Sequence, residues 1–220
     1  MIEYTNWGSI EYQEAWYKQK DLFEARVNAK ATVNNLSDIV VFCEHPHVYT
    51  LGKSGNSENL LVGNQLLKDK SVTFAKTDRG GDITYHGPEQ MVVYPIFDLE
   101  HFEIGLRKYI YNLEESVILF LSEYGVVGER LKGATGVWIE PFSTGKVRKI
   151  CAIGVKSSRF ITMHGLALNI NTDLSYYTYI NPCGFKDKGV TSLEKEIGEK
   201  QNMEVCRRLL FQKIIQVFNY

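Results

Sequence analysis

The sequence has few cysteines and almost no net charge, and both scarcities narrow its possible functions. Its four cysteines (Cys43, Cys151, Cys183 and Cys206) include no Cys-x-x-Cys pair, so we expect neither a disulfide framework nor a zinc ribbon. We therefore expect the cysteines to be free thiols in a reducing compartment. A net charge of −1 provides no overall field that would attract nucleic acid or anionic lipid. We therefore expect any electrostatic recognition of a partner to be local.

Long apolar runs are also missing. No stretch approaches the roughly 20 apolar residues that a membrane-spanning helix needs, and the N-terminus lacks a basic region followed by an apolar segment. We therefore expect a cytoplasmic protein with no membrane and no nucleic-acid partner. With 220 residues, of which 44% are hydrophobic and 23% charged, the chain can bury a core of ordinary size. A single domain over residues 1–220 is the simplest organisation.

The spacing of apolar residues predicts an α+β protein. Three- and four-residue spacings predict helices over residues 9–30, with Ser9 as N-cap, over 106–124 and over 203–218. Short β-branched or apolar runs predict strands over residues 38–43, 72–76, 91–97, 136–139, 150–155 and 161–170. Strands therefore cluster in the middle of the chain, an order that differs from a regular βαβ alternation.

Residues 79–90 (RGGDITYHGPEQ) form the first unusual segment, with three glycines between two predicted strands. Glycine allows backbone to approach a ligand closely, yet Gly-Gly and Gly-Pro are also common turn signals. A binding loop and an ordinary turn are about equally supported by composition. The segment lacks the spacing of either phosphate-binding loop, so nucleotide binding has no specific support.

Residues 146–156 form a second segment, a basic stretch that runs into a predicted strand, and Lys149 stands where that strand begins. A lysine accepts protons efficiently at neutral pH only if its pKa falls from ~10.4 toward 7, usually through burial. The neighbours Ile150, Ala152 and Ile153 would supply such burial, but periodicity alone favours an ordinary solvated lysine at a strand edge. Residues 146–159 hold five basic residues and no acidic one, a patch that would suit an acidic partner.

Cys183 stands between Pro182 and Gly184, a context that predicts a turn. Cys43 and Cys151 instead lie in apolar runs, as buried structural cysteines do, so Cys183 is the best nucleophile candidate. Its base remains open among three residues that are distant in sequence: His86, His164 and Lys149. The His45-Pro46-His47 pair lacks a third ligand at a metal-binding spacing, so we interpret it as structural and expect no metal site.

Several segments together resemble the LipB family of octanoyl-[acyl carrier protein]:protein octanoyltransferases. They follow in the family's order and cover most of the chain: residues 45–52 (HPHVYTLG), 59–61 (NLL), 79–90 (RGGDITYHGPEQ), 136–139 (GVWI), 149–154 (KICAIG), 164–170 (HGLALNI) and 181–184 (NPCG). The resemblance implies a fold shared with biotin and lipoate protein ligases, a mixed β-sheet flanked by helices. One departure is Glu89, which stands where the family typically has glycine.

The family's roles fall on residues that are present in this sequence. The resemblance implies that Cys183 accepts the acyl group as a thioester and that Lys149 is the general acid/base that lowers the pKa of the thiol. It also implies a set of substrate-binding residues: Arg79, Gly80, Gly81, Asp82, Ile83, Thr84, Tyr85, His86, Ala152, Ile153, Gly154, Gly165, Leu166 and Ala167.

The implied reaction is the first step of endogenous lipoate biosynthesis. The donor would be octanoyl-acyl carrier protein, and the acceptors would be lysines on the lipoyl domains of 2-oxoacid dehydrogenase E2 subunits and on the glycine cleavage H protein. Because a thioester is already activated, no cofactor, neither ATP nor a metal, is needed. The alternatives are an ATP-dependent lipoate or biotin ligase and a non-catalytic acyl-binding or lipoyl-domain-binding protein. Intact Cys183 and Lys149 argue against the second alternative.

Overall fold

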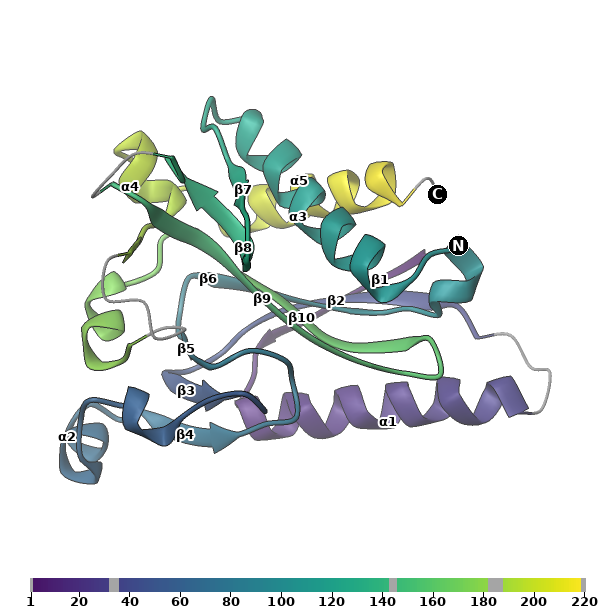
Figure 1. The fold of residues 1–220 in the computed structure, drawn as a ribbon, viewed down its shortest axis with the longest axis horizontal. Coiled ribbons are helices and arrows are strands. Elements are labelled where there is room, and N and C mark those ends of the chain that lie inside the picture. The colour runs from purple at the N-terminus through teal and green to yellow at the C-terminus, as the bar shows by residue number, and fades with distance from the viewer. Residues whose placement is uncertain (1, 32–35, 143–145, 182–187, 219–220) are drawn as a thin grey trace.

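The computed structural model describes residues 2–31, 36–142, 146–181 and 188–218. In these ranges an eight-stranded sheet runs in the order β1-β2-β6-β10-β9-β8-β7, with β11 paired to β9, and a smaller sheet runs β4-β3-β5 (Figure 1). The strands are β1 (Ile2–Ser9), β2 (Asp38–Glu44), β3 (Val48–Leu51), β4 (Thr73–Lys76), β5 (Ile83–His86), β6 (Gln90–Ile96), β7 (Glu129–Leu131), β8 (Ala134–Ile139), β9 (Arg148–Ser158), β10 (Ile161–Asn169) and β11 (Gly189–Val190). The helices are α1 (Tyr12–Ala31), α2 (Asn64–Asp69), α3 (Leu106–Ser122), α4 (Leu193–Ile197) and α5 (Met203–Val217).

Helices cover both faces of the large sheet. Figure 1 shows α1 on one side and α3 with α5 on the other. The side chains of β6 alternate between these layers: Val92 packs in the cluster that includes Phe23 of α1, whereas Val93 packs in the cluster that includes Phe120 of α3 and Leu210 of α5. A strand buried on both faces appears in sequence as a continuous apolar run. This architecture is the mixed α+β fold that the sequence predicted.

All six predicted strands and all three predicted helices are present, but the first helix begins later than expected. Ser9 is the last residue of β1, and α1 begins at Tyr12, so the prediction of Ser9 as N-cap is wrong. β1 pairs parallel with β2, with an irregular register between Asn6 and Ser9. Its residues are mostly polar, and Ile2 alone among them is buried. An edge strand of this composition gives little apolar signal.

Residues 79–90 are not one continuous loop. Ile83–His86 form β5, which pairs antiparallel with β3. Gly81 precedes β5 with a φ of +86°, a conformation that favours glycine. Only the parts flanking β5 are loop.

Glu89 adopts the left-handed backbone conformation, with a φ of +58°. Its N–H donates to the Glu44 carboxylate at 2.8 Å, and its own carboxylate accepts from Lys200 at 2.8 Å and from Asn171 at 3.2 Å. Glutamate therefore makes the turn that a glycine would make more easily. Its carboxylate is turned toward Asn171 and toward Lys200 in the loop before α5, and Glu89 is not among the residues that line the cavity described below.

None of the helices in the described ranges is both long and apolar enough to cross a bilayer.

Candidate active site

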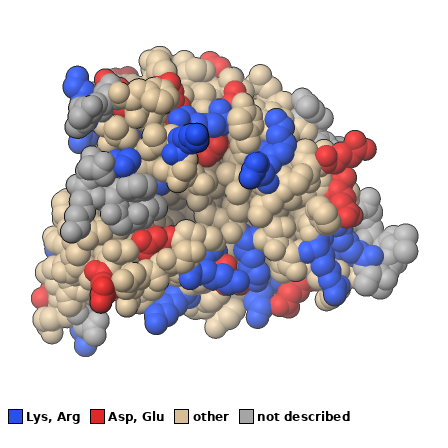
Figure 2. All heavy atoms as spheres, viewed as in Figure 1, with Lys and Arg blue, Asp and Glu red and all other residues tan. Residues whose placement is uncertain are grey.

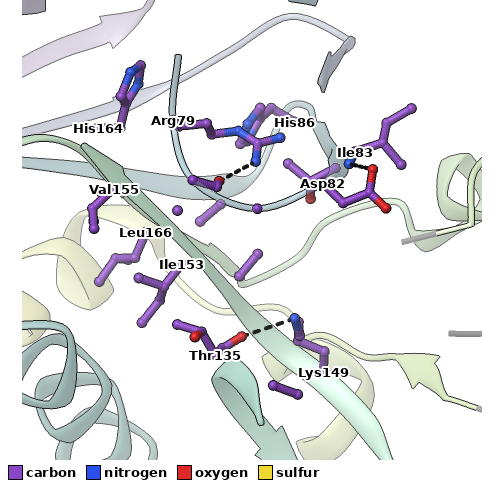
Figure 3. Close-up of a pocket in the computed structure, with 18 of the residues that line it drawn as sticks. Arg79, Asp82, Ile83, His86, Thr135, Lys149, Ile153, Val155, His164 and Leu166 are labelled. Carbon is purple, nitrogen blue, oxygen red and sulfur yellow. Dashed lines mark hydrogen bonds between the residues drawn. The ribbon is translucent and has the colours of Figure 1, made fainter. Parts of the chain in front are cut away.

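A cavity of about 460 Å³ opens between the glycine-rich segment, β9 and β10. Lys149 and every predicted substrate-binding residue except Tyr85 line it. Figure 3 shows these side chains around the cavity, with Arg79, Asp82 and His86 on one side and Ile153 and Leu166 on another. Segments far apart in the sequence thus converge on one hollow.

Tyr85 does not reach this cavity. Its neighbours Thr84 and His86 line the cavity, but successive side chains of a strand point to opposite faces. The fully buried Tyr85 ring stacks on Tyr176 with 5.0 Å between ring centroids, and its hydroxyl lies 2.7 Å from His47 Nδ1. Its contacts in the described structure are therefore those of a core residue of the smaller sheet.

The glycines at the cavity serve close backbone contacts. The Gly80 N–H donates to the Val155 carbonyl at 2.9 Å, and a Cβ on Gly154 would lie 2.7 Å from the Gly80 carbonyl oxygen. A Cβ on Gly165 would lie 2.0 Å from the Val93 carbonyl oxygen. Gly154 therefore lets the loop approach β9, while Gly165 lets β6 approach β10.

Arg79 is buried and binds backbone. Its Nη2 donates to the Thr50 carbonyl at 2.7 Å and its Nη1 to the Gly80 carbonyl at 3.0 Å. These charge-assisted hydrogen bonds tie β3 to the glycine-rich loop. Arg79 thus shapes the cavity wall in the described structure.

Two of the three candidate bases are buried histidines. Burial lowers the pKa of His86 to about 3, and its Nδ1 lies 2.8 Å from the Gln90 amide oxygen. Burial also lowers the pKa of His164, whose Nε2 lies 2.7 Å from Asp78 and whose φ is +63°. Both imidazoles are therefore neutral at neutral pH. Figure 3 shows His164 and Lys149 toward opposite ends of the cavity.

The third candidate base, Lys149, is half-buried at the start of β9. Its Nζ donates to the Thr135 carbonyl at 3.1 Å (Figure 3). The same Nζ lies 4.5 Å from the centroid of the Trp138 ring. The pairing of β8 with β9 changes register there, because Val137 pairs with Cys151 but Trp138 pairs with Lys149. The extra residue, Ile150, makes a bulge of the kind that redirects a side chain. Lys149 is therefore held by specific contacts.

Three of the four cysteines are free thiols buried in the described structure: Cys43, Cys151 and Cys206. Burial raises the pKa of each of these thiols. This confirms the prediction that Cys43 and Cys151 are buried structural residues. Cys183 lies outside the described residues together with Pro182 and Gly184, so its distance from Lys149 stays a prediction.

The basic stretch at residues 146–159 is partly neutralised by carboxylates from elsewhere in the chain. Arg148 pairs with Glu196 at 2.6 Å, and Lys156 pairs with Asp78 at 2.6 Å. Figure 2 shows lysine and arginine side chains on both sides of the central hollow on this face. The positive surface is therefore shared among several segments and is not one continuous patch.

His45 and His47 make structural contacts. The His45 Nδ1–H donates to the Ile10 carbonyl at 2.7 Å, and the Tyr94 hydroxyl donates to Nε2 at 2.6 Å. His47 stacks on Tyr176 with 4.2 Å between ring centroids. The part of the chain that the structure describes contains no group of three or more His, Cys, Asp or Glu residues arranged to hold a metal ion.

Sequence reasoning missed further residues that line the cavity, because the local patterns predicted helices and strands but not which of their side chains would face a cavity. They share an aromatic, apolar or amide side chain and include Tyr12, Tyr94, Leu106, Trp138, Asn169 and Tyr177. Trp138 had appeared only within a predicted strand and within the segment 136–139 that resembles the LipB family, with no role of its own. Its position beside Lys149 depends on how β8 pairs with β9.

Comparison with known proteins agrees with this geometry. The sequence matches the lipoyl protein ligase A/B catalytic domain over residues 11–215. A relative from Bacteroides fragilis named octanoyltransferase is 56% identical over 206 residues, which cover 93% of each chain. One of the same name from Parabacteroides distasonis is 54% identical over 217 residues, which cover 99% of this chain and 98% of the relative.

Solved structures of ligases share the fold. The bi-partite lipoate protein ligase from Thermoplasma acidophilum superposes with a TM-score of 0.72 at 13% identity, covering all of this chain and 84% of the other. A lipoate-protein ligase A bound with ATP gives a TM-score of 0.71 at 14% identity, covering all of this chain and 86% of the other. The architecture is thus that of lipoate protein ligases. The chain belongs to the lipoyl protein ligase A/B catalytic domain family, and within it to the octanoyltransferases.

Proposed function

We propose that this chain transfers an octanoyl group from octanoyl-acyl carrier protein, through a thioester on Cys183, to a lysine of a lipoyl domain. The name of its relatives supports the transfer of an octanoyl group. The observation that carries the proposal is the convergence of Lys149 with the predicted substrate-binding residues on one cavity.

The reaction begins with a Cys183 thiolate and a Lys149 ammonium. The thiolate attacks the donor thioester, the bond from carbonyl carbon to pantetheine sulfur breaks, and Lys149 gives its proton to the departing thiolate. An octanoyl-enzyme and a neutral Lys149 remain. The neutral amine of the acceptor lysine then attacks the octanoyl-enzyme, Cys183 leaves as thiolate, and the surplus proton of the amine returns to Lys149. The cycle closes without ATP.

The chain on either side of residues 182–187 supports this assignment of Cys183. After the segment, Val190 of β11 pairs with Lys149 of β9. Before it, the Asn181 N–H donates to the Asn59 carbonyl at 2.8 Å, and the Asn59 amide donates to Asp82 at the cavity wall at 2.6 Å. Cys183 is two residues beyond Asn181, and two residues span at most about 7 Å. A place at the cavity rim is therefore within reach.

The apolar part of the cavity supports an acyl substrate. Ile153, Val155 and Leu166 line it (Figure 3). Burying about six methylenes at roughly 0.8 kcal/mol each would contribute on the order of 5 kcal/mol to binding, which favours octanoyl over short acyl groups. Backbone N–H groups that line the cavity, other than that of Gly80, which donates to the Val155 carbonyl, are the natural donors to the oxyanion that forms on the carbonyl.

Replacing Gly154 by alanine is expected to raise KM for the octanoyl donor several-fold. The new Cβ would lie 2.7 Å from the Gly80 oxygen and 3.3 Å from Arg79 Cδ, so the loop must move at a cost of roughly 1–3 kcal/mol. Steady-state kinetics measure the effect. Gly63→Ala is the matched control because its Cβ would meet no atom within 4 Å. Equal KM values for the two variants would contradict the structural role of Gly154.

The proposed function is tested by transfer from octanoyl-acyl carrier protein to a lipoyl domain without ATP. Wild type is expected to transfer the group, Cys183→Ala to lose the activity, and Cys206→Ala to keep it, since Cys206 is buried on α5 away from the cavity. Octanoylation by Cys183→Ala from free octanoate and ATP would instead support a ligase. Binding of the acyl donor without transfer by wild type would support a non-catalytic protein.

A further inference from the structure

The carbonyl that holds Lys149 belongs to a peptide group with a second polar contact. The Thr135 oxygen accepts from Lys149 Nζ at 3.1 Å. On the other side of the same peptide bond, the Gly136 N–H donates to Glu114 Oε1 at 3.0 Å. One peptide group therefore connects a carboxylate on α3 to the ammonium group in the cavity.

Glu114 is itself fixed in place. Its side chain is only 11% exposed, and its second oxygen, Oε2, accepts from Arg130 Nε at 3.0 Å. Arg130 on β7 also pairs with Glu115 at 2.6 Å, and its guanidinium lies 3.7 Å from the centroid of the Tyr111 ring. The carboxylate thus has one oxygen for the arginine and one for the Gly136 N–H.

Gly136 allows this peptide group its orientation. Its φ is +120°, a value that L side chains rarely adopt, and a Cβ there would lie 2.4 Å from the Cys151 carbonyl oxygen. The same Cβ would lie 3.5 Å from Lys149 Cε. The glycine therefore lets β8 close against β9 while its N–H faces α3 and the preceding carbonyl faces Lys149.

We propose that Glu114 is a positioning residue for Lys149. Glu114 orients and polarises the Thr135–Gly136 peptide group, and the carbonyl of this group holds the Lys149 ammonium group in place. A carboxylate at the N–H end makes the carbonyl oxygen a stronger acceptor for an ammonium group, because hydrogen bonds in series polarise one another. The ammonium group is thereby kept at the cavity. This inference rests on the proposed function, in which Lys149 exchanges protons with the reacting sulfur atoms.

A purely structural Glu114 would only link α3 to β7 and β8. Glu115 provides a matched control for a purely structural role. Glu115→Gln removes the same charge as Glu114→Gln and also removes an ion pair to Arg130. Glu114→Gln keeps an acceptor oxygen for Gly136 but loses the charge, whereas Glu114→Ala loses both.

The test combines steady-state kinetics with the pH dependence of Cys183 alkylation by iodoacetamide, followed by mass spectrometry of the Cys183 peptide. Glu114→Ala is expected to lower kcat roughly 10-fold or more, with KM within about twofold of wild type, because a misplaced catalytic group affects the chemical step. The pH midpoint of alkylation should rise in the same direction as in Lys149→Met. Glu114→Gln should show smaller changes in kcat and in the pH midpoint of alkylation. Glu115→Gln should change neither kcat nor the midpoint.

The outcomes separate the inference from the proposed function. If Lys149→Met shifts the alkylation midpoint but both Glu114 variants behave like Glu115→Gln, the inference alone is wrong. If Lys149→Met also matches wild type, the role of Lys149 is wrong and the inference falls with it. Alkylation of the buried Cys43, Cys151 and Cys206 reports unfolding of a variant. If Glu114→Ala unfolds, kcat and the alkylation midpoint of Glu114→Gln, compared with those of Glu115→Gln, decide whether Glu114 positions Lys149.

Discussion

Replacing Lys149 by methionine is expected to lower kcat for octanoyl transfer by ~10² to 10⁴-fold, the usual contribution of a general acid/base. In wild type its Nζ is held by the Thr135 carbonyl and the Trp138 ring at the cavity. Methionine keeps much of the length of the side chain but can neither donate nor accept the proton. KM should change less, because cavity contacts from the glycine-rich segment and from β10 remain. Initial rates across donor concentrations separate the two quantities.

Lys146→Met is the matched control for this experiment. Lys146 belongs to the same basic stretch and is exposed, and it does not line the cavity. Its replacement removes the same charge and should leave kcat within about twofold, as surface substitutions usually do. A similar loss of kcat in both variants would mean that the overall positive charge of this face matters and that proton transfer by Lys149 does not.

Acidification is expected to destabilise the fold by about 4 kcal/mol between pH 7 and pH 5 through two buried histidines. Burial lowers the pKa of His45 to about 4 and that of His86 to about 3, from an ordinary value of 6.5. Below pH 6.5 the unfolded chain binds protons that the folded chain does not, so the free energy of unfolding falls as pH falls. At pH 5 the difference is about 2 kcal/mol for each histidine.

Urea denaturation at several pH values measures this effect. Between pH 8 and 7 both histidines are neutral in the folded state and mostly neutral in the unfolded state, so together they should change the free energy of unfolding by only about 0.3 kcal/mol there. His86→Asn should be less stable than wild type at pH 7, because Gln90 and Thr50 lose a partner. Its stability should nevertheless fall less steeply between pH 6 and 5, by about 1.4 kcal/mol per pH unit. An equally steep fall in the variant would show that His86 is not the group that takes up the proton.

Strands that are buried on both faces could be predicted from the sequence. Residues 90–96 and 161–169 are apolar almost throughout, because β6 and β10 are covered by helices on both sides. β1 could not be predicted, since an edge strand with one buried residue has neither a continuous apolar run nor a clear alternation. β5 was hidden between glycines, and its pairing with β3 is a tertiary contact.

Some residues of the candidate site could be nominated from short sequence segments alone. Composition left residues 79–82 equally consistent with a binding loop and an ordinary turn, and the family resemblance singled out both this segment, which lines the cavity, and Lys149. The environment of Lys149 could not be predicted, because Trp138 and Glu114 reach it only through the bulge in β9 and the packing of α3 on β8. The sequence left burial among apolar neighbours and a solvated strand edge both open for Lys149, whereas the structure shows contacts with a carbonyl and an aromatic ring.

Trapping the octanoyl-enzyme tests whether Cys183 carries the octanoyl group. Intact-mass and peptide mass spectrometry after incubation with octanoyl-acyl carrier protein, without an acceptor, should detect one octanoyl adduct on the Cys183 peptide. The adduct should be absent in Cys183→Ala, present in Cys206→Ala, and consumed when a lipoyl domain is added. Octanoyl transfer to the lipoyl domain by wild type without any trappable adduct on Cys183, or with an adduct on another residue, would show that Cys183 is not the residue that carries the octanoyl group.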